Sequence, residues 1–266
     1  MKKPSPTHSS RSSVCSDDIE MGGSITGIPI KSESKLKLIE DIDDILHGTT
    51  VANAHIHIRL RFLRKVFGIL TAQLLLTTII GATCISVPTI KLAVQQYPWT
   101  IMVGVIASIG LLIGMMVKRH ETPTNYMLLI AWTVCEAYTV GVVVSFYDKI
   151  VVLEAFILTT SVVAALFAYT FQTKRDFTTM GSGLFAMLWI LIIGGLFQMF
   201  ILSPMLEFGL GLAGAVVFSF FIIFDLQMIM THISPEEYIM ATINLYLDIL
   251  NLFLYILRIL QAINRE

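Results

Sequence analysis

Seven apolar segments, each about 20 residues long, follow one another along most of the chain and are separated by short polar stretches. A transmembrane helix needs roughly 20 apolar residues, and only helices and closed barrels satisfy their backbone hydrogen bonds inside a bilayer. The chain is 55% hydrophobic and only 14% charged, whereas a soluble domain carries about a quarter charged residues. The pattern predicts an all-α polytopic membrane protein, a bundle of seven transmembrane helices at about 64–86, 97–117, 126–147, 150–171, 183–203, 208–231 and 239–261.

The first 55 residues differ in kind from the rest. Residues 1–34 are rich in Ser, Gly, Pro and Lys, a composition typical of disorder. We expect a disordered cytosolic tail over 1–55 and a seven-helix transmembrane domain over 56–266. The tail lacks the apolar core of a signal peptide, and the first span is therefore expected to act as the membrane signal. A net charge of -1 gives no general attraction to nucleic acid, and three scattered cysteines predict neither a disulfide framework nor a metal cluster. We therefore expect no resident cofactor.

Basic residues gather on one side of the predicted membrane. Loops on that side and the start of the first span carry Arg59, Arg61, Arg64, Lys65, Lys118, Arg119, Lys174 and Arg175, whereas the opposite loops carry Lys91 and Lys149. Cytosolic loops are enriched in Lys and Arg, so this count places the N-terminus in the cytosol. Seven full spans would put the C-terminus outside or in a lumen, and a re-entrant seventh segment would return it to the cytosol. Because the seventh segment contains several polar residues, we expect it to be either central in the bundle or re-entrant.

Two aspartates, Asp225 and Asp248, lie inside the last two apolar segments. A carboxylate at membrane depth is costly unless it is paired, hydrated or protonated. At 1.5 Å per residue, they lie roughly 10 and 13 Å from the same cytosolic surface, on adjacent antiparallel helices. Two neighbouring carboxylates in a low dielectric cannot both ionise cheaply, so we expect them to share a proton, or to bind a hard cation such as calcium transiently. The alternative is that each merely hydrogen-bonds a neighbouring helix.

Other polar residues are weaker candidates for the same pathway. Asn244 and Asn251 lie within one turn of Asp248 and are expected on its face. Glu136, in the third apolar segment, either lines the same cavity or forms a structural pair. Glu236 and Glu237, beside Pro235, either attract cations at a pore mouth or stabilise a helix N-terminus. Arg119 either reaches inward to a carboxylate or is a solvated charge that sets topology.

Five stretches of the chain resemble one known family. They are IRLRFLRKVFGILTAQLLLTT (58–78), LEAFILTTSVV (153–163), AYTFQTKRDFTTMGSGLFAMLWIL (168–191), FIIFDLQMIM (221–230) and SPEEYIMATINLYLDILNLFLYILRIL (234–260). Together they resemble the BAX-inhibitor-motif, or lifeguard, membrane proteins, and most of all the Golgi anti-apoptotic protein branch. The resemblance covers about residues 55–266. One departure is the sequence Phe-Asp-Leu-Gln at 224–227, where relatives often have Tyr-Asp-Thr, so a hydroxyl near Asp225 is missing.

The resemblance implies a seven-helix bundle with a central last helix and a pH-sensitive leak pathway, chiefly for calcium, in Golgi or endoplasmic reticulum membranes. It also implies suppression of apoptosis. The family's pair of aspartates forms a pH-sensitive latch and matches Asp225 and Asp248. A latch arginine near the second span is matched here by Arg119, and acidic residues of the loop before the last helix, matched by Glu236, affect ion passage. The expected partners are thus the bilayer, calcium ions and protons.

Two other functions remain open on the residues alone. An intramembrane aspartic protease also uses two membrane aspartates, but its Gly-x-Gly-Asp motif is missing here, where Tyr-Leu-Asp occupies 246–248. We therefore expect no enzymatic activity. A scaffold that regulates cell death by binding membrane-protein partners is the main alternative to a channel.

Overall fold

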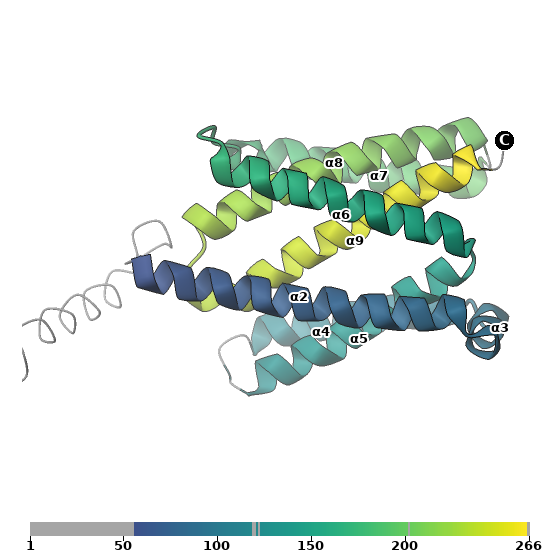
Figure 1. The fold of residues 1–266 in the computed structure, drawn as a ribbon, viewed down its shortest axis with the longest axis horizontal. Helices are drawn as coiled ribbons and strands as arrows, with labels where there is room; N and C mark the ends of the chain where they lie inside the picture. The colour runs from purple at the N-terminus through teal and green to yellow at the C-terminus, as the bar shows by residue number, and fades with distance from the viewer. Residues whose placement is uncertain (1–55, 119–120, 122, 202, 265–266) are drawn as a thin grey trace, which may run out of the picture. The chain divides into compact units, whose positions relative to one another are not determined.

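A computed structural model describes residues 56–118, 121, 123–201 and 203–264, which are largely α-helical and contain no strand (Figure 1). Within these residues seven helices are long and apolar enough to cross a membrane, which confirms the predicted fold class. They are α2 (Ile56–Ser86), α4 (Thr100–Val117), α5 (Thr124–Ser145), α6 (Lys149–Gln172), α7 (Gly181–Phe200), α8 (Pro204–Thr231) and α9 (Tyr238–Ile263). The predicted tail over 1–55 and Arg119 lie outside the described residues.

Helix α2 begins at Ile56, eight residues before the first predicted span. Its 31 residues extend roughly 46 Å, whereas a bilayer's hydrocarbon core is about 30 Å thick. The basic side chains in its first turns therefore do not interrupt the helix, because these turns can project beyond the hydrocarbon.

Helix α3 (Pro88–Gln96), between α2 and α4, was not predicted from the sequence. Its nine residues are too few to be recognised as a membrane span. Pro88 occupies its first turn, where the missing backbone N–H of proline costs no helical hydrogen bond. The Gln95 side chain donates a 2.6 Å hydrogen bond to the backbone oxygen of Ser145, which fastens α3 to the end of α5. The two 3-10 turns, η1 (Thr178–Met180) and η2 (Pro235–Glu237), precede α7 and α9.

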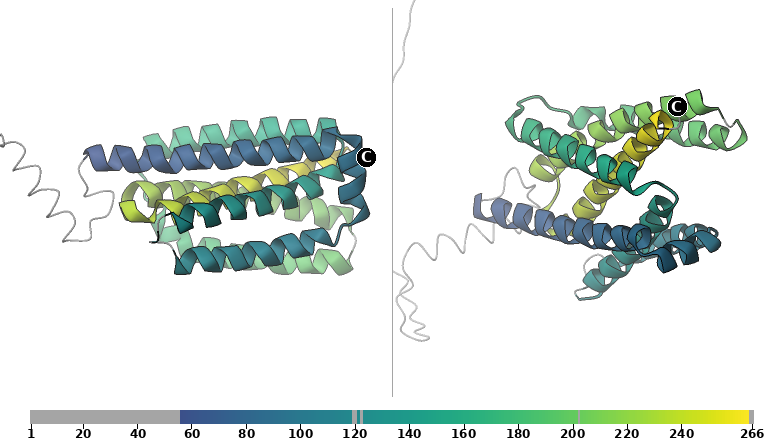
Figure 2. Two further views of the ribbon diagram at one scale, coloured as in Figure 1. Left: turned by 90° about the horizontal axis from the view of Figure 1, so that it is seen from below. Right: turned by 45° about the vertical axis from the view of Figure 1, so that its right-hand side comes forward.

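Helix α9 is the central element of the bundle. It lies between α2 on one side and α6 and α8 on the other (Figures 1 and 2). Thirteen of its 26 residues are buried, against two of 20 in α7. It is also continuous, and 26 residues extend about 39 Å, so the structure supports the central alternative and not the re-entrant one.

Hydroxyl side chains inside the spans mostly bond to their own helix. Each donates to the backbone carbonyl one turn earlier, so that it has no unmet donor in the apolar surroundings. Hydrogen bonds of this kind, at 2.7 to 3.0 Å, are made by Thr71, Thr77, Thr78, Thr83, Thr133, Thr139, Thr159, Thr160, Ser161, Thr170, Ser219, Thr231 and Thr242. These residues therefore do not require a hydrated cavity.

Two glycines allow α8 to pack closely against α9. A Cβ atom added at Gly211 would lie 2.9 Å from Cγ1 of Ile259, and one added at Gly214 would overlap the ring of Tyr255. Gly209, in the same helix, is exposed and has open space at its Cβ position. The small residues thus set the close approach of the two helices that carry Asp225 and Asp248.

We predict that Gly214→Ala destabilises the bundle whereas Gly209→Ala does not. The overlap with Tyr255 should cost about 1–3 kcal/mol, and Gly209→Ala should be neutral or slightly stabilising because alanine favours the helix. Thermal unfolding in detergent, followed by circular dichroism, measures both variants against the wild type. Equal melting temperatures for the two variants would contradict the close packing at Gly214.

We also predict that the two ends of the helical unit lie on opposite sides of the membrane. Helix α2 begins and α9 ends at opposite ends of the bundle (Figure 1). The sequence contains no Asn-x-Ser/Thr site of its own, so a tag carrying one such site reports only its own location. A tag at the C-terminus should become glycosylated, and the same tag at the N-terminus should not. The reverse result would contradict the charge-based orientation.

Candidate functional site

The structure brings Asp225 of α8 and Asp248 of α9 together. The two helices are antiparallel and joined by a short connection that contains η2, and the two carboxyl groups lie close enough to interact directly. A hydrogen bond between two carboxyl groups requires one of them to carry a proton. Asp225 is half-buried and Asp248 is only 7% exposed, so a proton shared by the pair would lie in largely apolar surroundings.

Aliphatic side chains flank the carboxyl pair along both helices. Ile222 and Ile229 lie one turn to either side of Asp225, and Leu245 and Leu252 do the same for Asp248. All four are at most 1% exposed. In such surroundings two full negative charges in contact are strongly disfavoured, and a single shared proton is the stable arrangement.

The predicted asparagine helpers do not gather around this pair. Asn244 is exposed, although it lies one turn before the buried Asp248. Asn251 is half-buried, and its side-chain nitrogen donates a 2.9 Å hydrogen bond to the backbone oxygen of Leu247. One oxygen of Asp248, Oδ2, is buried and has no hydrogen-bond partner among the described residues.

Glu136 lies on another helix pair, deeper in the predicted membrane. It is half-buried on α5 and accepts a short hydrogen bond from the hydroxyl of Ser108 on α4. Ser108 is only 4% exposed, so a buried hydroxyl compensates part of the cost of this carboxyl group. Glu136 and Ser108 thus form a structural pair, which is one of the two roles that the sequence left open for Glu136.

The acidic residues of η2 lie at the entry to α9. Ser234 caps this turn, and its hydroxyl accepts a 3.5 Å hydrogen bond from the Glu236 N–H. Glu236 is exposed and Glu237 is half-buried. Both positions fit the stabilisation of a helix N-terminus, and the exposed Glu236 also presents its charge at the same end of the bundle as the carboxyl pair.

Two contacts at this end of the bundle were not predicted from the sequence. The ammonium group of Lys65 lies 3.3 Å from the ring centroid of Tyr238 and 5.7 Å from that of Tyr126, which ties α2, α9 and α5 together. The only sign of this contact in the sequence was that Lys65 stands next to several arginines at the start of the first predicted span.

The second missed contact is made by Gln227, two residues after Asp225. Its side-chain oxygen accepts a hydrogen bond from the Phe177 N–H, and its nitrogen donates to the Arg175 carbonyl, both at 2.7 Å. In the same loop, hydrogen bonds from the Thr178 hydroxyl and N–H hold the pKa of Asp176 below its usual value. Gln227 thus clamps the α6–α7 loop to α8.

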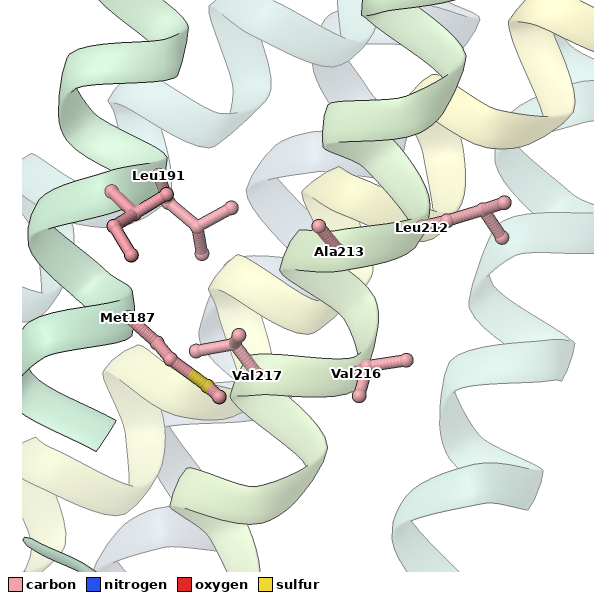
Figure 3. Close-up of a pocket in the computed structure, with 7 residues that line it drawn as sticks. Met187, Leu191, Leu212, Ala213, Val216 and Val217 are labelled. Atoms are coloured by element: carbon pink, nitrogen blue, oxygen red, sulfur yellow. The ribbon is translucent and has the colours of Figure 1, made fainter. Parts of the chain in front are cut away.

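An apolar groove separates α7 from α8 at the level shown in Figure 3. Its cavity volume is about 420 Å³, and its walls are entirely aliphatic or thioether side chains. They are Met187, Ile190, Leu191, Leu212, Ala213, Val216 and Val217. It offers no ligand to an ion, and its chemistry matches lipid acyl chains.

No group of three or more His, Cys, Asp or Glu side chains converges within the described part of the chain. The Asp225–Asp248 pair offers only carboxyl oxygens from two residues, whereas calcium takes six to eight oxygen ligands in a stable site. The pair therefore fits brief contact with a partly hydrated cation better than permanent metal binding.

Comparison with known proteins covers nearly the whole described unit. The family described as "Inhibitor of apoptosis-promoting Bax1" matches residues 59–266. Protein lifeguard 4 from Mus musculus is 46% identical over 224 residues, covering 84% of this chain and 94% of that protein. The Golgi anti-apoptotic protein of Vaccinia virus (strain Lister) matches with the same identity and coverage. Bax inhibitor 1 of Schizosaccharomyces pombe is 37% identical over 257 residues, covering 96% of this chain and 97% of that protein.

These matches confirm the resemblance found in the sequence motifs. The family model spans well over half of the chain, and the relatives align along almost their entire lengths. The description of this family indicates a role in suppressing cell death. The chain is a member of the BAX-inhibitor, or lifeguard, family of anti-apoptotic membrane proteins.

Proposed function

We propose that this protein is a pH-sensitive, calcium-permeable leak channel of intracellular membranes, which limits stored calcium and thereby suppresses apoptosis. The observation that carries the proposal is the buried Asp225–Asp248 pair between α8 and the central helix α9. Ionisable residues inside transmembrane helices are costly and rare, and they often mark ion and proton pathways.

The chemistry of the pair favours passage of a cation over storage. A conducting site must bind an ion well enough to admit it and weakly enough to release it. Two carboxyl groups with one unpartnered buried oxygen supply negative charge without a complete coordination shell. Calcium would therefore retain part of its hydration while it passes the pair.

The shared proton provides the pH sensitivity. Loss of this proton leaves two like charges in contact, and gain of a second proton removes the negative charge that a cation needs. Either change alters the contact that joins α8 to α9. The resemblance adds Arg119 as a third partner of this latch.

The cellular setting is proposed from the relatives. One relative is named a Golgi anti-apoptotic protein, and the seven apolar helices place this chain in a membrane. We therefore propose Golgi or endoplasmic reticulum membranes, with the N-terminus in the cytosol. Release of stored calcium through a slow leak lowers the amount available for death signalling.

We predict that the full-length protein, in liposomes loaded with a calcium-sensitive dye, conducts calcium at a rate that changes between pH 6 and 8. Asp225→Asn and Asp248→Asn should each lose the wild-type pH response, because the one remaining carboxyl group cannot share a proton with a second carboxyl group and titrates differently. Asp148→Asn, at an exposed aspartate before α6, is the matched control and should retain it.

The possible outcomes separate the competing functions. Flux no greater than in empty liposomes would refute the channel and leave a scaffold that acts through partner binding. Flux whose pH response survives in both Asn variants would refute the carboxyl latch while retaining the channel.

We further predict that Glu236→Gln lowers calcium flux by roughly twofold at low salt. An exposed carboxylate at a pore mouth raises the local cation concentration, and salt screens this effect because the Debye length falls to about 3 Å at 1 M. Flux should therefore match the wild type at 1 M salt. Glu154→Gln, at an exposed position on α6, should behave as the wild type at both salt concentrations, and equal effects of the two variants would exclude a mouth role for Glu236.

A further inference from the structure

The central helix α9 presents polar side chains on two different faces. Asp248 meets Asp225 of α8 on one face. Tyr246 lies two residues earlier, and two residues correspond to about 200° around a helix, so its side chain points to nearly the opposite face. There it meets α2 and α5 and is completely buried. The two contacts lie at almost the same depth because two residues advance a helix by only about 3 Å.

A directed chain of hydrogen bonds joins Tyr246 to α2. The Tyr246 and Thr77 hydroxyl oxygens are 2.8 Å apart, and the Thr77 hydroxyl donates its proton to the Gln73 backbone oxygen, also at 2.8 Å. Because a hydroxyl has one proton, Tyr246 must be the donor to Thr77. The Gln73 side chain in turn donates to the Thr133 hydroxyl of α5 at 2.8 Å, and Thr133 donates to the Leu129 carbonyl.

This polar cluster is closed but not fully satisfied. The indole of Trp132 packs edge-on against the Tyr246 ring with centroids 5.4 Å apart, and neither side chain is exposed. Two buried atoms of the cluster, Oε1 of Gln73 and Nε1 of Trp132, have no hydrogen-bond partner among the described residues. A buried acceptor and a buried donor without protein partners both raise the free energy of this closed arrangement.

We propose that the Tyr246–Thr77 hydrogen bond, supported by Gln73 and Thr133, is a second gate of the pathway, a hydroxyl gate on the face of α9 opposite the carboxyl pair. This inference rests on the proposed leak function. For ions to pass, α9 must separate from a neighbouring helix, and the hydroxyl gate resists its separation from α2. The carboxyl pair sets how flux depends on pH, whereas the uncharged gate sets how large the flux is at any pH.

The groups around the gate support this division of roles. Its members on α2 and α5 are an amide, two hydroxyls and an indole, none of which titrates near neutral pH. The titratable side chains to consider here are Glu136 of α5, which accepts a hydrogen bond from the Ser108 hydroxyl, and Asp248, two residues further along α9. Removing the tyrosine hydroxyl therefore changes no charge.

The test compares calcium flux through Tyr246→Phe and Thr77→Val with the wild type in the same liposomes. Each variant removes the interhelical bond while keeping the shape of the side chain, and Thr77→Ser retains the hydroxyl. The matched control is Tyr138→Phe, because Tyr138 of α5 makes the same kind of bond, at 3.0 Å, to the Thr100 hydroxyl of α4. Melting temperatures in detergent establish that all variants are folded.

Loss of one such hydrogen bond should raise flux roughly two- to tenfold, with the pH at half-maximal response unchanged. Thr77→Ser and Tyr138→Phe should remain at the wild-type level. The double variant Tyr246→Phe/Thr77→Val should exceed neither single variant appreciably, because both remove the same bond. A variant flux at or below the wild-type value, or a shifted pH response, would overturn the hydroxyl gate while leaving the channel intact. Absence of flux in the wild type would instead refute the proposed function and the gate with it.

Discussion

A polar helix cannot face lipid, and the arrangement of this bundle follows from that constraint. Helix α9 carries an aspartate, a tyrosine hydroxyl and a threonine at membrane depth, all of which are buried inside the protein. The surrounding helices provide this cover, with α2, α6 and α8 in direct contact with α9. Outer helices such as α7 are correspondingly apolar around most of their circumference and expose large side chains. The cost of dehydrating a few groups thus decides which helix is central.

The same constraint explains why the carboxyl pair and the hydroxyl cluster differ in character. The carboxyl groups can reduce their cost by sharing a proton, which makes their contact dependent on pH. The hydroxyl cluster has no such option and is stabilised only by hydrogen bonds between uncharged groups. In the proposed mechanism, α9 is held on one side by a contact that responds to pH and on the other by a contact that does not.

Much of the architecture could be predicted because it depends on repeated local patterns. Runs of about 20 apolar residues predict the spans, and the polar residues of the last run predict that it is either central in the bundle or re-entrant. The meeting of Asp225 and Asp248 follows from counting residues along an antiparallel helix pair. The family resemblance then assigned these residues to an ion pathway, which the geometry alone does not do.

Other features depend on tertiary geometry that sequence patterns do not contain. Asn244 was expected on the face of Asp248, but four residues rotate a helix by about 40°, enough to leave it exposed. The contacts of Gln227 and Lys65 depend on where a loop and a flexible side chain end, and α3 is too short to give a hydropathy signal. Tyr246 carries no sequence signal of a polar contact, because its partner, the hydroxyl of Thr77, is 169 residues away along the chain.

The hydroxyl groups that bond within their own helix have a consequence for biogenesis. A helix whose polar groups are satisfied internally can enter the bilayer alone, before any neighbour exists. Asp248 is different, because its partner is on α8, and Tyr246 requires α2. The last two helices therefore gain by entering the membrane as one hairpin, with the proton already shared, into a bundle whose α2 is in place. The order of synthesis meets this need, since α9 follows both α2 and α8 along the chain.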